Sequence, residues 1–364
     1  MVNIKNRGYV SPFAVHPGET VREALEYSGL SQADLGERTQ ISEKTISLIL
    51  SGQQPVTPET ALKLERVLGL SYDLLVGMQA QYEADEFRLA EQARLQEEVS
   101  HLPSFSCFPE LVKLGYVKSV REPVEKVEEL LKFFGLNSLG SVPAVFKAAW
   151  KKSNKHTISS ESLSAWLHIG KIESLKRETQ DYNSDKLKEN IVKMRALTKE
   201  KADVFAPALI ELCAEAGVVL VFTPHLKNTR VNGAARWLTP KKALVQISLY
   251  NKYADIFWFT LFHELGHILK HSKKLSFVDD MGDLEVNEME DQANKFAQQI
   301  IVPPDKEKEF SLLKTQLNTA NVKEKVISFA KSIDIEPGII AGRVGREMDA
   351  WPFVSSLRRR LEFK

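Results

Sequence analysis

Two histidines and a glutamate in the C-terminal half of the chain have the types and spacing of a metal-dependent hydrolytic site. His263 and His267 stand at positions i and i+4, so on a helix their imidazoles share one face and can bind one Zn²⁺ ion. Glu264 lies about 100° around the same helix, beside the metal rather than on it. Its carboxylate can take a proton from an attacking water and pass it to a leaving amine. The pattern predicts a zinc peptidase with Glu264 as catalytic base; the alternative is a pair of histidines that only pack together.

A third ligand is expected on the following helix, because a catalytic zinc takes three protein ligands and keeps one position open. Glu290 lies 23 residues after His267, which leaves room for a loop and a returning helix. Asn294 shares the face of Glu290, and we expect it to hydrogen-bond a ligand from behind. Glu288, on another face, is the competing ligand. His271 extends the histidine face by one turn and is expected behind the ligands or at the rim.

The sequence segments that must position these residues have the patterns of an α+β, predominantly α fold. We expect its C-terminal domain to be zincin-like. The helix that carries the two histidines is apolar on most sides, as a buried active-site helix should be. A β-branched run and an alternating pair of segments around Thr239-Pro240-Lys241-Lys242 predict a small sheet with one hairpin. We expect strands at 218–222, 233–238 and 243–248, and helices at 204–216, 253–271 and 286–301.

Three segments carry a resemblance to a known family. They are Trp258-Phe259-Thr260-Leu261-Phe262-His263-Glu264-Leu265-Gly266-His267-Ile268-Leu269, Glu290-Asp291-Gln292-Ala293-Asn294-Lys295-Phe296-Ala297 and Ile300-Ile301-Val302-Pro303. Together they resemble the ImmA/IrrE metallopeptidases, whose pattern is a His-Glu-x-x-His helix, then Glu-x-x-Ala-Asn-x-Phe-Ala and a proline stop. The resemblance implies His263, His267 and Glu290 as zinc ligands and Glu264 as general base. It also implies a DNA-bound repressor as substrate, because known members cleave such repressors during stress or phage induction.

The N-terminal segment predicts five short helices with capping residues at their starts. Residues 30–52 resemble an XRE-type helix-turn-helix, and with the preceding His16-Pro17-Gly18-Glu19 they look most like the HigA group of antitoxin-type regulators. A short turn sets the two helices at a wide angle, so the second projects its first residues into the major groove. The alternative is a helical bundle used only for protein contacts. The residues expected to contact operator DNA are Gln32, Ser42, Glu43, Lys44, Thr45 and Ser47.

Charge is distributed unevenly along a chain whose net charge is +1. Residues 1–78 carry a net charge of −2, so this segment should bind DNA weakly unless a homodimer uses paired half-sites. Residues 147–201 carry +6 and include Trp150, Trp166 and Tyr182, which would suit single-stranded nucleic acid. We favour the simpler interpretation of a solvated helical face.

Composition sets the remaining limits. Hydrophobic residues make up 43% of the chain and charged residues 27%, which is typical of a soluble globular protein. The two cysteines, Cys107 and Cys213, exclude a cysteine-rich zinc cluster, and no apolar run predicts a membrane span or a signal peptide. We therefore expect a cytoplasmic protein. The oxyanion-stabilising residue stays open among Arg230, His225 and Arg236.

These features predict four parts: a helix-turn-helix domain at 1–78, a helical linker at 79–108, a helical middle region at 109–200 and a metallopeptidase domain at 201–364. The main hypothesis is a dimeric DNA-binding regulator that cleaves a repressor or antitoxin with Zn²⁺. The alternative is a non-proteolytic antitoxin or transcription factor whose zincin-like domain senses a ligand or holds a toxin. The intact Glu264 favours the first, because a pure binding domain needs no general base.

Overall fold

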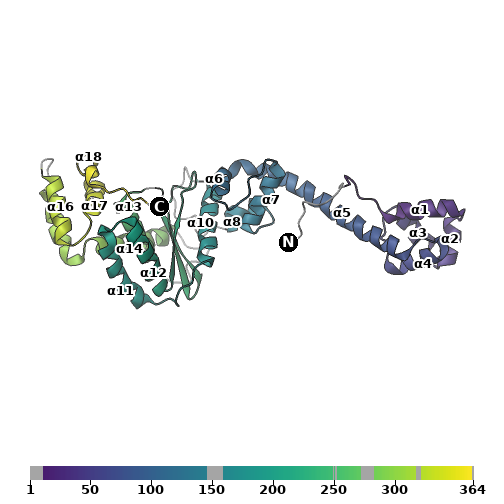
Figure 1. The fold of residues 1–364 in the computed structure, drawn as a ribbon, viewed down its shortest axis with the longest axis horizontal. Coiled ribbons are helices and arrows are strands. Elements are labelled where there is room, and N and C mark those ends of the chain that lie inside the picture. Colours follow the sequence, from purple (N-terminus) through teal and green to yellow (C-terminus); the bar gives the residue numbers. More distant parts are fainter. Residues whose placement is uncertain are drawn as a thin grey trace. The chain divides into compact units, whose positions relative to one another are not determined.

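The chain folds into two units that each enclose a core of their own, Met1–Ser100 and His101–Lys364 (Figure 1). The computed structural model describes residues 11–145, 159–248, 250, 252–271, 283–316 and 321–362. Across these stretches no helix combines the length and the apolarity that a membrane crossing requires.

The part of the first unit that the structure describes, from residue 11 on, contains five α-helices whose starts are fixed by side-chain caps. Ser31 accepts a hydrogen bond from the Asp34 N–H, and the Asp34 carboxylate accepts one from the Ser31 N–H, which closes a capping box. Ser42, Thr57 and Ser71 each cap the helix that follows them. The helices are α1 (Pro17–Ser28), α2 (Gln32–Thr39), α3 (Glu43–Leu50), α4 (Pro58–Leu68) and α5 (Tyr72–Glu98).

The fifth helix extends beyond residue 78, where the sequence predicted that the first domain ends. α5 continues without a break to Glu98, because residues 79–98 contain neither Gly nor Pro and Gly77 is tolerated within the helix. The linker expected over 79–108 therefore begins inside α5, and the unit boundary after Ser100 follows the end of that helix. The division of the chain into four domains stays a prediction.

The second unit is organised around a three-stranded sheet, β1 (Val218–Thr223), β2 (Gly233–Thr239) and β3 (Lys242–Ser248). The strand order is β1-β3-β2, with β3 parallel to β1 and antiparallel to β2. Register pairs Val218 with Ala243 on one side and Gly233 with Ile247 on the other. The three expected strands and the hairpin are thus present, and the predominantly α, α+β fold class is confirmed.

Helices cover both faces of this sheet (Figure 1). α10 (Ser160–Leu175) packs against β1 and β3 on one face, where Gly170 leaves room for the Gln246 side chain. The other face meets α12 (Ala202–Glu215) and α13 (Ala254–Lys270), and α14 (Asp283–Ile301) packs against α13. The described residues of the unit also form the α-helices α6 (Phe108–Lys113), α7 (Pro123–Phe134), α8 (Val142–Val145), α11 (Ser184–Ala196), α15 (Glu307–Thr315), α16 (Val322–Ser332), α17 (Pro337–Met348) and α18 (Trp351–Val354). Short 3-10 helices lie at Val99–Ser104, Leu139–Ser141, Leu197–Lys199, Pro304–Lys306 and Ser355–Leu357.

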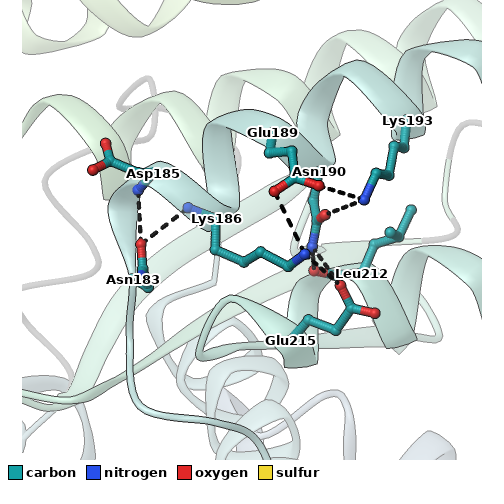
Figure 2. Close-up of polar contacts among 8 residues, drawn as sticks. All are labelled: Asn183, Asp185, Lys186, Glu189, Asn190, Lys193, Leu212 and Glu215. Atoms are coloured by element: carbon teal, nitrogen blue, oxygen red, sulfur yellow. Dashed lines mark hydrogen bonds and ion pairs between the residues drawn. The ribbon is translucent and has the colours of Figure 1, made fainter.

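Within the basic stretch of the middle region, the described helix α11 carries lysines that have acidic neighbours. Figure 2 shows α11 against α12, where the Asn190 amide donates to Leu212 O at 2.8 Å and to Glu215 Oε2 at 3.0 Å. Lys186 lies 3.5 Å from Glu215, and Lys193 lies 2.6 Å from Glu189, so these cations have anionic neighbours.

The two described aromatic residues of that stretch, Trp166 and Tyr182, pack inside the unit. Trp166 is fully buried, and Tyr182 packs edge-on against Trp237 with ring centroids 4.7 Å apart. Trp150 lies outside the described residues. Base stacking by Trp166 is therefore ruled out, in favour of the solvated-face interpretation.

Candidate metal centre and helix-turn-helix

The metal-site helix α13 is held rigidly because it is buried along almost its entire length. Phe257, Trp258, Leu261 and Leu265 are buried in the main core of the second unit. At Gly266 the helix approaches α14 so closely that an added Cβ would stand 3.0 Å from Phe296 Cδ1. Gly266 therefore permits the contact that brings the two helices together.

Three donor atoms converge between α13 and α14. The Nε2 atoms of His263 and His267 lie 3.0 Å apart, and the Glu290 carboxylate oxygens lie 3.2 Å and 3.3 Å from them. Ligands about 2.0–2.1 Å from a tetrahedral Zn²⁺ are separated from one another by about 3.3–3.4 Å. The spacing of this donor set fits a single zinc ion. Glu288, the competing ligand, is exposed and does not belong to the cluster.

Hydrogen bonds behind the histidines prepare them to act as ligands. The Nδ1–H of His263 donates to Asn294 Oδ1 at 3.0 Å, which leaves a lone pair on Nε2. The Nδ1 of His267 lies 3.0 Å from Nδ1 of His271, and donation in that direction has the same effect on His267. Two nitrogen lone pairs and a carboxylate then point at one place, an arrangement that a cation stabilises. Asn294 and His271 thus lie where the sequence placed them, behind the three donors.

Glu264 lies beside the three donors in a buried position. Its side chain is 5% exposed, and Oε2 accepts no hydrogen bond from the residues that the structure describes. The start of β2 borders it, since a Cβ on Gly233 would stand 2.9 Å from Glu264 Cγ and 2.6 Å from Thr260 Cγ2. Gly233 was not singled out from the sequence. A glycine opening a strand next to the metal-site helix is the signal that could have identified it.

The three residues considered for oxyanion stabilisation lie in different settings. The Arg236 guanidinium donates to Leu167 O at 2.7 Å, so it faces α10 across the sheet from α13. Burial lowers the pKa of Arg236 to about 10. His225 stacks on Tyr250 and its Nδ1 lies 3.0 Å from the Thr229 hydroxyl, while Arg230 adopts a positive φ of 44° in the loop before β2. Of these three residues, Arg236 has a structural contact, because its hydrogen bond to Leu167 O joins β2 to α10.

The second site is the helix-turn-helix formed by α2 and α3. Ser42 accepts from the Thr45 N–H at 3.1 Å, so its hydroxyl sets the first turn of α3. Thr45 is half-buried. The other five candidate DNA contacts are exposed on α3, its cap or the start of α2: Gln32, Ser42, Glu43, Lys44 and Ser47.

The His16-Pro17-Gly18 segment has a structural role in this unit. His16 caps α1, with Nδ1 accepting from the Gly18 N–H at 2.9 Å, and its ring packs edge-on against Tyr82. A Cβ on Gly18 would stand 2.0 Å from Ile49 O, so only glycine lets α1 lie against the end of α3. This segment therefore fixes α1 against the end of α3.

Comparisons with known proteins identify both units. Residues 21–75 match a helix-turn-helix family model, and residues 249–323 match a peptidase family model described as an IrrE N-terminal-like domain. Virulence-associated protein I of Dichelobacter nodosus is 36% identical over 80 residues, which is 22% of this chain and 71% of that protein. The HTH-type transcriptional regulator YddM of Escherichia coli K12 is 32% identical over 63 residues, 17% of this chain and 67% of that protein.

Two further comparisons are more distant. An HTH-type transcriptional regulatory protein of Methanothermobacter thermautotrophicus is 26% identical over 116 residues, 32% of this chain and 33% of that protein. A solved addiction module antidote protein of the HigA family from Coxiella burnetii is 23% identical, with 23% of this chain and 94% of that chain covered and a TM-score of 0.22.

The fold and the two sites define a class: a regulator with an XRE-type helix-turn-helix joined on one chain to a metallopeptidase-type domain. Through its first unit the chain belongs to the helix-turn-helix family of transcriptional regulators, and its second unit carries an IrrE-like domain.

Proposed function

We propose that this protein is a DNA-binding regulator whose second unit is a zinc-dependent peptidase acting on another protein. The observation that carries the proposal is the convergence of His263 Nε2, His267 Nε2 and the Glu290 carboxylate at 3.0–3.3 Å, with Glu264 buried alongside. A purely structural pair of histidines would need neither the carboxylate nor the neighbouring acid.

In this mechanism His263, His267 and Glu290 would hold the metal. Zn²⁺ bound there would supply Lewis acidity, which polarises a peptide carbonyl and makes a water molecule more acidic. The Glu264 carboxylate accepts the proton of the attacking water and donates it to the leaving amine. Its burial excludes competing solvent, and Asn294 and His271 hold the imidazoles in the required tautomer.

We propose a repressor or antitoxin as the substrate. The support is the pairing of a regulator-type DNA-binding unit with a peptidase-type domain on one chain, which delivers the peptidase to proteins that occupy the same operators. The first unit would bind double-stranded DNA as a homodimer, because residues 1–78 carry a net charge of −2 and attract phosphates weakly, so that two half-sites would supply contacts that one does not. Lys44 and Ser47, both exposed on α3, would face the groove.

The peptidase is tested with the zinc-loaded full chain and the regulator proteins encoded by neighbouring genes. New protein N-termini are labelled and sequenced after incubation, and bound zinc is measured on the same samples. We expect cleavage by the wild type and none by Glu264→Gln, with equal zinc in both. Cleavage by Glu264→Gln at the wild-type rate would remove the mechanism. Zinc content unaffected by His263→Ala and Glu290→Ala would remove the metal site.

DNA binding is tested on fragments selected from random duplexes. Lys44→Ala should weaken binding to the selected fragment and reduce its dependence on salt, because one phosphate or base contact is lost. Gln32→Ala provides a second position, and Lys63→Ala on α4 is the control for loss of charge alone. Equal losses for Lys44 and Lys63 would contradict the placement of α3 in the groove.

A further inference from the structure

An open groove runs alongside the metal centre on the surface of the second unit. Its volume is about 530 Å³, and it is lined by Phe259, Asp291, Asn294, Lys295, Gln298 and Arg346. Two residues that line the groove also contact His263. Asn294 is hydrogen-bonded to its imidazole, and the centroid of the Phe259 ring lies 6.1 Å from the centroid of the His263 ring. If a peptide bound at the metal centre, one of its side chains could therefore enter this groove.

The charged residues of the groove are dominated by two cations without ion pairs. Arg346 and Lys295 are both exposed, and within the described part of the chain neither has a carboxylate within 4.0 Å. Arg343, one turn earlier on α17, is by contrast held at 2.7 Å by both Glu307 and Glu347. The buried Asp255 carboxylate, which feels the charge of Arg346, is already paired with Arg358 at 3.0 Å.

Arg346 also makes a cation–π contact at the wall of the groove. Its guanidinium lies over the half-buried Phe259 ring, 4.9 Å from the centroid. A guanidinium stacked on an aromatic face keeps its N–H edge free, and that edge matches the two oxygens of a carboxylate. The exposed Asp291 is the single anion of the lining, so the balance of the groove is positive.

We propose that this groove is a specificity subsite that receives an acidic side chain, Asp or Glu, of the peptide substrate. The methylene groups of that side chain pack on Phe259, its carboxylate binds Arg346, and Lys295 adds a second cation from α14. The role of the groove as a substrate subsite rests on the proposed peptidase function. The binding preference itself depends only on the residues of the groove.

The test measures binding separately from cleavage. Zinc-loaded full chain carrying Glu264→Gln is titrated with fluorescent octapeptide pools, random in neutral residues but with one fixed Glu, Gln or Lys at each position in turn. We expect the Glu pool to bind about fivefold more tightly than the Gln pool at one position, as for a partly exposed charge pair. Arg346→Gln should abolish that preference, and Arg346→Glu should transfer it to the Lys pool. Arg121→Gln, an exposed arginine outside the groove, is the control and should leave it unchanged.

The outcomes distinguish failure of the proposed subsite from failure of the proposed peptidase function. A Glu preference that survives both Arg346 substitutions, or no preference at any position, overturns the subsite. An Arg346-dependent preference together with a wild type that cleaves neither the pools nor the neighbouring regulator proteins supports the acidic groove and refutes the peptidase. Cleavage by the wild type with no dependence on Arg346 supports the peptidase and refutes the subsite.

Discussion

Removal of the Asn294 side-chain amide should weaken zinc binding without disturbing the fold. In the structure Asn294 Oδ1 lies 3.0 Å from His263 Nδ1, and this contact keeps the proton off Nε2, the atom that faces the other two donors. In Asn294→Ala the imidazole can rotate and can carry its proton on Nε2. Loss of such a partner typically raises the metal dissociation constant about 10- to 100-fold, or about 1.4–2.7 kcal/mol.

Asn294→Asp provides the matched control. The aspartate keeps an oxygen in the same place and adds a negative charge, so His263 should remain at least as strong a ligand as in the wild type. Alanine is a better helix former than asparagine, so α14 itself should not be weakened in Asn294→Ala. The two variants thus separate loss of the hydrogen bond from loss of the amide.

Competition against a chromophoric chelator in metal-free buffer gives the zinc affinity of each full-chain variant, and circular dichroism checks the helix content. We expect a strong loss in Asn294→Ala and none in Asn294→Asp. The reasoning fails if Asn294→Ala binds zinc within about twofold of the wild type, or if both variants lose affinity equally.

Three further predictions concern other parts of the chain. Arg358→Met leaves the buried Asp255 carboxylate without its ion pair and should destabilise the second unit by about 3–5 kcal/mol in urea unfolding, with recovery when Asp255→Asn is added. Burial lowers the pKa of His16 below its ordinary 6.5, so the folded first unit favours neutral His16 and should lose stability as pH falls from about 7.5 to 5.5; His16→Asn, which keeps a capping oxygen, should flatten that dependence in thermal melts. Gly233→Ala should push Glu264 aside and lower peptide cleavage about tenfold or more while zinc content stays constant.

The sequence was informative where a single helix repeat sets the geometry. His263 and His267 share a face because the helix has 3.6 residues per turn, and the same repeat separates Glu290 from Glu288. The same periodicity places Asn294 on the face of Glu290 and His271 on the face of the two histidines. The hydrogen bond between Asn294 and His263 depends in addition on the packing of α13 against α14.

The sequence predicted fewer of the contacts that strands or distant segments make near the site. Residues 233 and 236 lie an odd number of positions apart on β2, so their side chains point to opposite faces of the sheet. That alternation places Gly233 beside Glu264 and Arg236 against α10, and it could have been applied before the structure was known. The stacking of Arg346 on Phe259 joins residues far apart in the chain, and no local pattern indicates it.

The arrangement of the candidate metal centre also indicates that helix packing positions its three donors. The donors come from two helices, and those helices meet closely at Gly266, where an added Cβ would lie 3.4 Å from Ala293 Cα. Ala293 and Ala297 are fully buried, so α14 is anchored to the same core as α13. Because this contact lies one turn of α14 from Glu290, small side chains there fix the carboxylate opposite the two imidazoles. Such a site is preorganised: binding energy need not be spent on drawing the helices together and can instead favour one geometry of ligands and substrate.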